Sequence, residues 1–203
     1  MKSDPELMSE FAQGEESAFD KLVKRHQVGL LNFFFRLVWD QTLAEDLTQE
    51  VFLRLYMHRE EYEPRAKFTT YLYRIGRNCW IDYLRRTKSE RKVRSLDAQD
   101  ENGHSLAEAV AARAEDPRST VGKDELTGAV VEAIDALPEE HKLVFILSEV
   151  QGLKYQEISE TLNIPVGTVK SRMFHAVKRL REHLGRSMKG ATGPWQEAAD
   201  ESS

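Results

Sequence analysis

The sequence has 203 residues, of which 40% are hydrophobic and 31% are charged, and its formal net charge at pH 7 is −5. These values are typical of a soluble globular protein with one domain or two small ones, and neither the short apolar runs nor the polar start "MKSDPELMSE" fits a membrane span or a signal peptide. The single cysteine, Cys79, excludes an internal disulfide and a cysteine-based metal cluster. We therefore expect a cytoplasmic protein with no cofactor and no membrane contact of its own.

The charge is unevenly distributed along the chain. Residues 74–94 contain eight Arg and Lys against two acids, and residues 165–189 contain seven against one. Between them, residues 97–124 contain seven acids and three bases. This alternation predicts two contacts with polyanions, separated by a connector that avoids them.

The first half of the chain has the apolar spacing of helices, which predicts helices over residues 5–13, 17–39, 42–58 and 68–86. Asp4 is the expected N-cap of the first helix, with Pro5 in its first turn. Thr42 and Glu45 have the spacing of a capping box at the start of the third. A loop is expected around Pro64.

The second half begins with a segment that lacks periodicity, because residues 89–120 are polar and contain Gly and Pro. Helices are expected again over residues 124–136, 139–149, 155–162 and 165–184. The pattern predicts an all-α protein with a domain over residues 1–94, a flexible acidic linker over 95–122, a second domain over 123–186, and a disordered tail over 187–203.

The last two predicted helices are separated by a short turn at Asn163 and Ile164, which is the spacing of a helix-turn-helix motif. Pro165 suits a first helical turn, and the free amides beside Gly167 favour a phosphate. A basic surface helix without a partner is the simpler alternative. The exposed aromatic Phe174 favours a partner, and the outward polar residues of the first turns point to the major groove of duplex DNA.

Residues 68–86, "FTTYLYRIGRNCWIDYLRR", interleave aromatic and basic side chains. Single-stranded nucleic acid needs both, because bases stack on rings while cations follow the phosphates. The alternative is that the rings belong to the core, which we favour for Phe68 and Tyr83. Both alternatives stay open for Tyr73 and Trp80.

A third feature is the amphipathic segment "DLTQEVFLRLY". Its polar and apolar side chains lie on adjacent helical turns, which fits either a solvated charged face or a protein-docking face.

These residues together resemble the extracytoplasmic-function group of sigma factors in the sigma-70 family, over about residues 9–184. Three segments carry the resemblance in the family's order, with a connector before the last: "AEDLTQEVFLRLY", "FTTYLYRIGRNCWIDYLRR" and "LSEVQGLKYQEISETLNIPVGTVKSRMFHAVKRL". The resemblance implies a region 2 domain and a region 4 helix-turn-helix domain. It also implies a function, namely that the protein binds core RNA polymerase, directs it to promoters and helps to melt the DNA.

The resemblance also implies roles for individual positions. Docking on the clamp helices of the polymerase would use Asp46, Gln49, Glu50 and Leu53. Capture of the melted non-template strand of the minus-ten element would use Tyr62, Arg65, Lys67, Phe68, Tyr73, Arg74, Arg77, Asn78, Asp82 and Arg85, at the cost of flipping a base. Recognition of the duplex minus-thirty-five element would use Tyr155, Pro165, Gly167, Thr168, Lys170, Ser171, Arg172, Phe174, His175 and Arg179.

The implied partners are core RNA polymerase (clamp helices and flap), promoter DNA both as duplex and as melted strand, and an anti-sigma factor. His175 stands where relatives often carry Arg, so the resemblance does not predict which base or phosphate it contacts, and the tail has no counterpart in the family. The alternative function is a dimeric helix-turn-helix regulator that binds duplex operators. Such a protein has no use for the surface over residues 62–86.

Nothing in the sequence indicates an enzyme, because the six histidines are scattered and no phosphate-binding glycine loop is present.

Overall fold

The computed structural model describes residues 2–63, 67–97 and 125–190, and within these ranges it contains helices and no strand. The predicted all-α class is confirmed. The elements are α1 (Asp4–Ala12), α2 (Glu16–Val38), α3 (Gln41–Met57), η1 (Arg59–Glu61), α4 (Phe68–Asp97), α6 (Glu125–Asp135), α7 (Glu139–Phe145), the π-helical turn η3 (Ile146–Val150), α8 (Tyr155–Leu162) and α9 (Val166–Gly190). In the described part of the chain, no helix is long and apolar enough to cross a bilayer.

The N-cap predicted for the first helix is wrong. Ser3 caps α1, and Glu6 completes a capping box by accepting a hydrogen bond from the Ser3 backbone N–H at 2.6 Å. Asp4 lies inside the helix instead, where its carboxylate pairs with Arg25 and accepts a 2.9 Å hydrogen bond from His26 of α2. The carboxylate therefore joins α1 to α2 rather than closing the helix end.

The cap predicted for α3 is also displaced. Asp40 is the N-cap, and its side chain accepts a hydrogen bond from the Leu43 backbone N–H at 2.9 Å. Thr42 and Glu45 consequently lie within the helix. A carboxylate just before the helix is among the best N-caps, so Asp40 displaces the weaker Thr42.

The first helical set, α1 to α4, packs around a continuous apolar core. Fully buried side chains line it from each of these helices, among them Phe11, Leu22, Phe34, Leu55 and Leu72. Cys79 is also buried there, and burial raises the pKa of its thiol to about 11.

Helix α4 continues to Asp97, eleven residues beyond the predicted end at 86 and three residues into the predicted linker. The rest of that linker, residues 98–122, lies outside the described residues.

The second helical set, α6 to α9, contains the predicted helix-turn-helix. Asn163 adopts a left-handed conformation (φ 53°) that ends α8, and the Ser159 hydroxyl donates a 2.6 Å hydrogen bond to the Ile164 carbonyl across the turn. Pro165 stands just before α9 rather than in its first turn, and its carbonyl accepts the Val169 N–H at 3.1 Å.

Two boundaries in this set also differ from prediction. The helix expected over 139–149 changes to a π-turn at Ile146, and α9 includes residues 187–190, which were assigned to the tail. The remaining tail, residues 191–203, lies outside the described residues.

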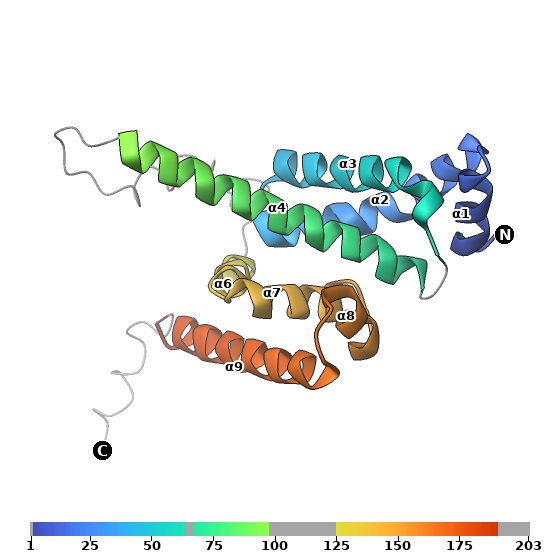
Figure 1. The fold of residues 1–203 in the computed structure, drawn as a ribbon. Coiled ribbons are helices and arrows are strands. Elements are labelled where there is room, and N and C mark those ends of the chain that lie inside the picture. The colour runs from blue at the N-terminus through green and yellow to red at the C-terminus, as the bar shows by residue number, and fades with distance from the viewer. Residues whose placement is uncertain (1, 64–66, 98–124, 191–203) are drawn as a thin grey trace, which may run out of the picture.

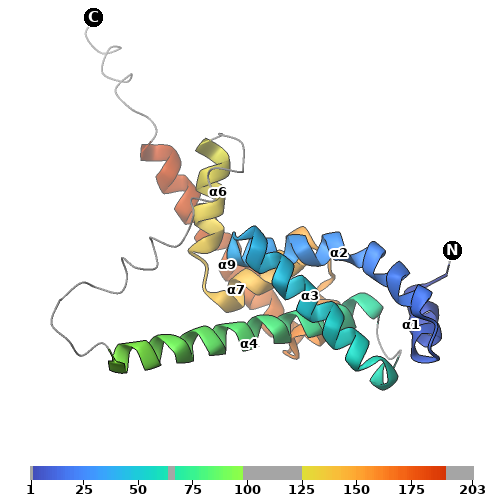
Figure 2. The same cartoon turned by 90° about the horizontal axis from the view of Figure 1, so that it is seen from above.

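The two helical sets pack against each other. Figure 1 shows α7 and α8 lying below α4, with α9 on the far side of α7, and the turned view in Figure 2 agrees. The Tyr73 hydroxyl of α4 donates a hydrogen bond to Gln151, and the Trp80 indole N–H donates one to Glu139 at 3.2 Å. One apolar cluster extends through both sets, from Leu7 to Met173.

Candidate nucleic-acid interface

Helix α9 presents a polar face with one large exposed ring. Its apolar stripe of Val169, Met173 and Ala176 is buried against the neighbouring helices. The opposite side exposes five of the predicted duplex-contacting residues, and the Phe174 side chain is 67% exposed. These five are Lys170, Ser171, Phe174, His175 and Arg179. The structure therefore brings them together on the two or three turns that a major groove accepts.

The start of α9 is accessible as well. Pro165 and Gly167 are exposed and Thr168 is half-buried. A Cβ added at Gly167 would meet no atom within 4 Å, so nothing within the described part of the protein requires a glycine there. The position remains open to the approach of another backbone.

Two other predicted residues of this set are held by the protein itself. Arg172 pairs with Glu140 of α7, and its side chain is 23% exposed. Tyr155, at the start of α8, packs partly against the core. Both side chains are thus partly engaged in contacts within the protein.

The polar face of α9 continues onto α7 through His141, a residue that the sequence analysis missed. The His141 ring stacks on His175, with ring centroids 5.9 Å apart and an interplanar angle of 17°. Burial, together with the positive charges of Arg179, His175 and Arg172, lowers the pKa of His141. No sequence signal indicated the pair, because the two residues belong to different helices.

The aromatic residues of α4 have different environments from its cations. Phe68, Tyr73 and Trp80 are at most 7% exposed, and Tyr83 stacks on Trp80 with ring centroids 5.5 Å apart. Phe68 is thus a core residue, as favoured. Tyr73 and Trp80, for which both roles were open, are packing residues in this structure, and burial raises the pKa of the Tyr73 hydroxyl.

The polar residues of α4 form a stripe along the helix. Arg74, Asn78 and Arg85 are exposed, while Arg77 and Asp82 are half-buried. The Arg77 guanidinium donates a 3.3 Å hydrogen bond to the Asn78 side chain. This stripe, residues 74–85, is what the structure offers to a nucleic-acid backbone.

An aromatic cluster lies at the N-terminal end of this stripe. Tyr62 packs edge-on against Tyr71 and Phe68, with centroid distances of 5.1 Å and 6.1 Å, and His26 lies 5.1 Å from Phe68. The Tyr62 hydroxyl is buried and has no hydrogen-bond partner among the described residues. Of the other residues predicted here, Lys67 is exposed and pairs with Glu157 of α8, and Arg65 lies outside the described residues.

The predicted docking face of α3 is largely exposed. Asp46 and Gln49 are exposed, and the Leu53 side chain is 53% exposed. Met57, which the sequence analysis missed, is 67% exposed one turn further on and extends the apolar end of this face. Its spacing of four residues from Leu53 was the available signal.

Glu50 has a different role from its neighbours on α3. It pairs with Arg54 at 2.8 Å, and Arg54 also binds Asp82 of α4 at 2.9 Å. The chain Glu50–Arg54–Asp82 therefore joins α3 to α4, and it places a predicted polymerase contact next to a predicted DNA contact.

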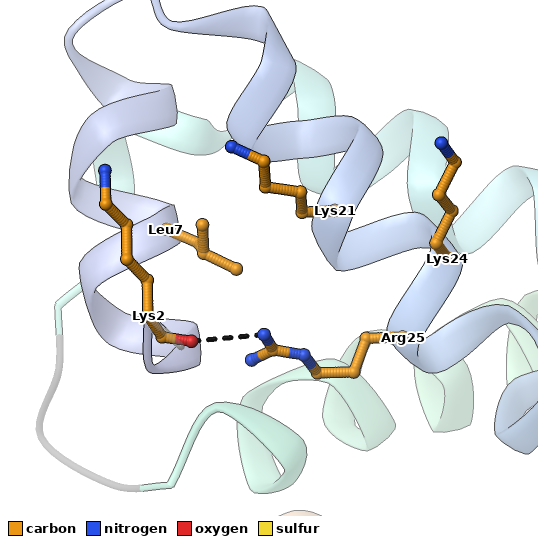
Figure 3. Close-up of a pocket in the computed structure, with 5 residues that line it drawn as sticks. All are labelled: Lys2, Leu7, Lys21, Lys24 and Arg25. Atoms are coloured by element: carbon orange, nitrogen blue, oxygen red, sulfur yellow. Dashed lines mark hydrogen bonds between the residues drawn. The ribbon is translucent and has the colours of Figure 1, made fainter.

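A cavity of about 530 Å³ lies between α1 and α2 (Figure 3). Its lining combines cationic side chains with one leucine, and Arg25 donates a 3.1 Å hydrogen bond to the Lys2 carbonyl. It holds no nucleophile beside a general base, so it does not suggest an active site. Among the described residues, no group of three His, Cys, Asp or Glu could hold a metal ion.

Comparison with known proteins gives matches over both helical sets. The family described as Sigma-70 region 2 matches residues 22–90, and the family described as Sigma-70, region 4 matches residues 127–180. The chain is 32% identical over 172 residues to the ECF RNA polymerase sigma factor SigW of Bacillus subtilis, which covers 85% of this chain and 91% of that protein. It is also 32% identical to the RNA polymerase sigma-H factor of Pseudomonas aeruginosa, with 90% and 94% covered.

A solved structure shows the same fold. The sigma factor RpoE from Bartonella quintana, crystallised with the anti-sigma factor NepR, matches with a TM-score of 0.62 at 22% identity, over 82% of this chain and 96% of that one.

Proposed function

The chain belongs to the extracytoplasmic-function group of the sigma-70 family and directs RNA polymerase to promoters, and we propose that it does so through two separate DNA-contacting surfaces. The polar face of α9 contacts the duplex minus-thirty-five element. The stripe 74–85 of α4, with the aromatic cluster around Tyr62, holds the melted minus-ten strand. The observation that carries this proposal is the presence of both surfaces in one chain, since a regulator that binds only duplex DNA needs one.

The chemistry of α9 suits duplex recognition. Lys170, Ser171 and His175 present hydrogen-bonding groups, and Phe174 offers an apolar surface to a thymine methyl group. The free amides at the start of the helix favour a phosphate, which would fix the register of the helix on the DNA. Arg179, between three and four turns further on, suits a second phosphate contact.

The chemistry of α4 suits an unpaired strand. Exposed Arg74 and Arg85 supply positive charge along the stripe, and Asn78 supplies an amide that can bind a base edge. The rings around Tyr62 offer a stacking surface for a flipped base, and the buried Tyr62 hydroxyl without a partner offers a hydrogen-bond group inside it. Phe68 and Tyr73 support this surface from the core.

Polymerase docking is assigned to the exposed face of α3. An exposed apolar pair, Leu53 and Met57, about two turns after the exposed acid Asp46 on the same helix, has the composition of a protein contact. The second helical set would contact the flap. Because the proposed activity requires polymerase and the chromosome, we propose that the protein acts in the cytoplasm.

The contact between the helical sets supports a requirement for polymerase. Lys67 and Arg74, which belong to the proposed minus-ten surface, contact Glu157 and the Glu160 carbonyl of α8. These residues cannot bind a DNA strand fully while the contact persists. The free protein should therefore bind promoter DNA poorly, and polymerase binding should separate the two sets.

Transcription assays with purified core polymerase test this function. We expect promoter-specific run-off transcripts from a genomic library when the protein is added, and none from core polymerase alone. Lys170→Ala should weaken binding to minus-thirty-five duplexes, and Tyr62→Ala should reduce promoter opening more than duplex binding. Nanomolar binding of the pure protein to a specific duplex without polymerase would instead support the dimeric regulator.

An anti-sigma factor is the further partner that we propose. The solved RpoE of similar fold was crystallised with one, and the exposed apolar face of α3 in the free protein is a surface that such an inhibitor could cover in competition with polymerase. Addition of the inhibitor should then abolish the run-off transcripts, and excess core polymerase should restore them.

A further inference from the structure

The contact between His141 and His175 joins α7 to the exposed face of α9. His141 is the third residue of α7, and its ring stacks on His175 at a centroid distance of 5.9 Å and an interplanar angle of 17°. His175 also meets the Phe174 ring, at 5.5 Å and 74°. The exposed imidazole is therefore in contact with one ring on its inner side and another beside it.

The first turn of α7 holds α9 at a second point. Glu140 pairs with Arg172, which lies one helical turn before His175. Glu140 and His141, which are consecutive in α7, thus contact Arg172 and His175 of α9. The latter two lie three residues apart and therefore face the same neighbouring helix. His141 is half-buried, and its Nδ1 atom is buried without a hydrogen-bond partner among the described residues, so its orientation depends on packing and not on a hydrogen bond at that atom.

We propose that His141 is a positioning residue that fixes the imidazole of His175 for contact with the minus-thirty-five duplex, an inference that rests on the function proposed above. An unsupported surface imidazole would sample several rotamers, and binding would have to restrict them. The His141 ring stacked against His175 in the free protein restricts these rotamers before DNA binds. Loss of the stack should therefore weaken recognition at the base pair that His175 contacts, by about threefold to tenfold.

The charges around His141 and His175 affect the protonation of the pair. Arg172, Arg179 and Lys178 of α9 surround the two rings with positive charge, and Glu140 is the acid of α7 beside them. One turn beyond Arg179, Glu182 and His183 line the same cavity as His175. Ala133 of α6 also lines it, together with Ala136 and Leu137, which follow that helix. In the free protein, burial and the cations lower the pKa of His141 and favour its neutral form.

Duplex phosphates would add negative charge beside these rings and favour the protonated form of His141. Protonation of His141 and DNA binding are then linked, and the pKa of His141 is higher in the complex than in the free protein. The gain in affinity is fully present below the free-state pKa and is lost as the pH rises through the pKa of the complex. A residue with a merely structural role would not produce this dependence.

The experiment uses holoenzyme assembled from core polymerase and the full chain, with a set of promoters that carry every single substitution in the minus-thirty-five element. His141→Ala and His175→Ala should change the preference at the same base pair, and the double variant should be no worse than His175→Ala. His141→Phe keeps a ring in the stack and should restore the wild-type preference. The rise in affinity between pH 8 and pH 6 should be absent in His141→Phe, which keeps the ring but cannot bind a proton.

His183→Ala is the matched control, because it removes an imidazole from the same helix two turns away. It should keep the wild-type preference. The inference is overturned if His141→Ala weakens all promoters equally, if the two substitutions add, or if His141→Phe behaves like His141→Ala while its melting temperature is unchanged. A wild-type holoenzyme without any minus-thirty-five preference would overturn the proposed function as well, so the two failures are distinguishable.

Discussion

The His26 side chain is half-buried between Asp4 of α1 and Phe68 of α4, and two opposing influences act on its imidazole. Burial lowers its pKa, and the nearby Asp4 carboxylate raises it, but burial is the larger effect and the pKa of His26 is lowered overall. The sequence did not indicate the contact between His26 and Asp4, because Asp4 was expected to cap its own helix. Asp4 could form hydrogen bonds either as an N-cap or with side chains of another helix. Only the positions of its neighbours in space decide between these two roles.

This residue predicts a dependence of stability on pH. The folded state binds a proton at His26 less readily than the unfolded chain, whose histidine pKa is about 6.5. Stability from this source is therefore complete above about pH 6.5, the unfolded-state value, and is lost as the pH falls below it through the lower pKa of the folded state. Thermal unfolding between pH 7.5 and pH 5.5 should show a larger drop in Tm for the wild type than for His26→Gln. Equal drops would contradict the assignment.

At the scale of the elements, periodicity predicted the position of most helices, but it could not predict which faces are covered. Tyr73 and Trp80 were left open between core and nucleic-acid contact. Their partners, Gln151 and Glu139, lie 78 and 59 residues further along the chain. Local sequence patterns contain no information on contacts between residues so far apart. The exposed face of α3 follows from the amphipathic pattern of α3 itself, so it could be expected from the sequence.

That exposed face gives a second prediction. Leu53→Asp should reduce the affinity for core polymerase at least tenfold, because an interface centre is apolar and a buried unpaired carboxylate is costly there. The folded state should be little affected, since Leu53 is 53% exposed. Val28→Asp is the control, because Val28 is an equally exposed apolar residue on α2 (61%). Polymerase pull-down together with thermal unfolding distinguishes docking from folding, and equal losses for both variants would exclude a specific role of α3.

On the scale of the whole molecule, the two helical sets pack against each other, a contact that the sequence did not predict. The contact combines apolar burial with few hydrogen bonds, and the Gln151 Nε2 atom within it is buried without a partner among the described residues. An unpaired buried donor costs about 1–3 kcal/mol. The contact is therefore weaker than its packing suggests, which suits an arrangement that polymerase must open.

Opening can be measured between fluorescent labels on Glu45→Cys of α3 and Arg181→Cys of α9, which are both exposed positions. Gln151→Ala leaves the Tyr73 hydroxyl buried without its acceptor, so we expect lower energy transfer and at least threefold tighter binding of a single-stranded minus-ten oligonucleotide. Gln156→Ala, an exposed change on the neighbouring helix, is the control. If the two helical sets separate but the oligonucleotide does not bind more tightly, the contact between the sets does not cover the minus-ten surface.

The burial of Cys79 limits the signals to which this protein can respond directly. Only the thiolate form of cysteine reacts readily with oxidants, and a pKa of about 11 leaves roughly one thiol in ten thousand ionised at pH 7. The sequence has no other cysteine. Thiol chemistry within this chain is thus a poor sensor of oxidative stress, and a redox signal would have to be detected by a partner and passed on through changes in binding.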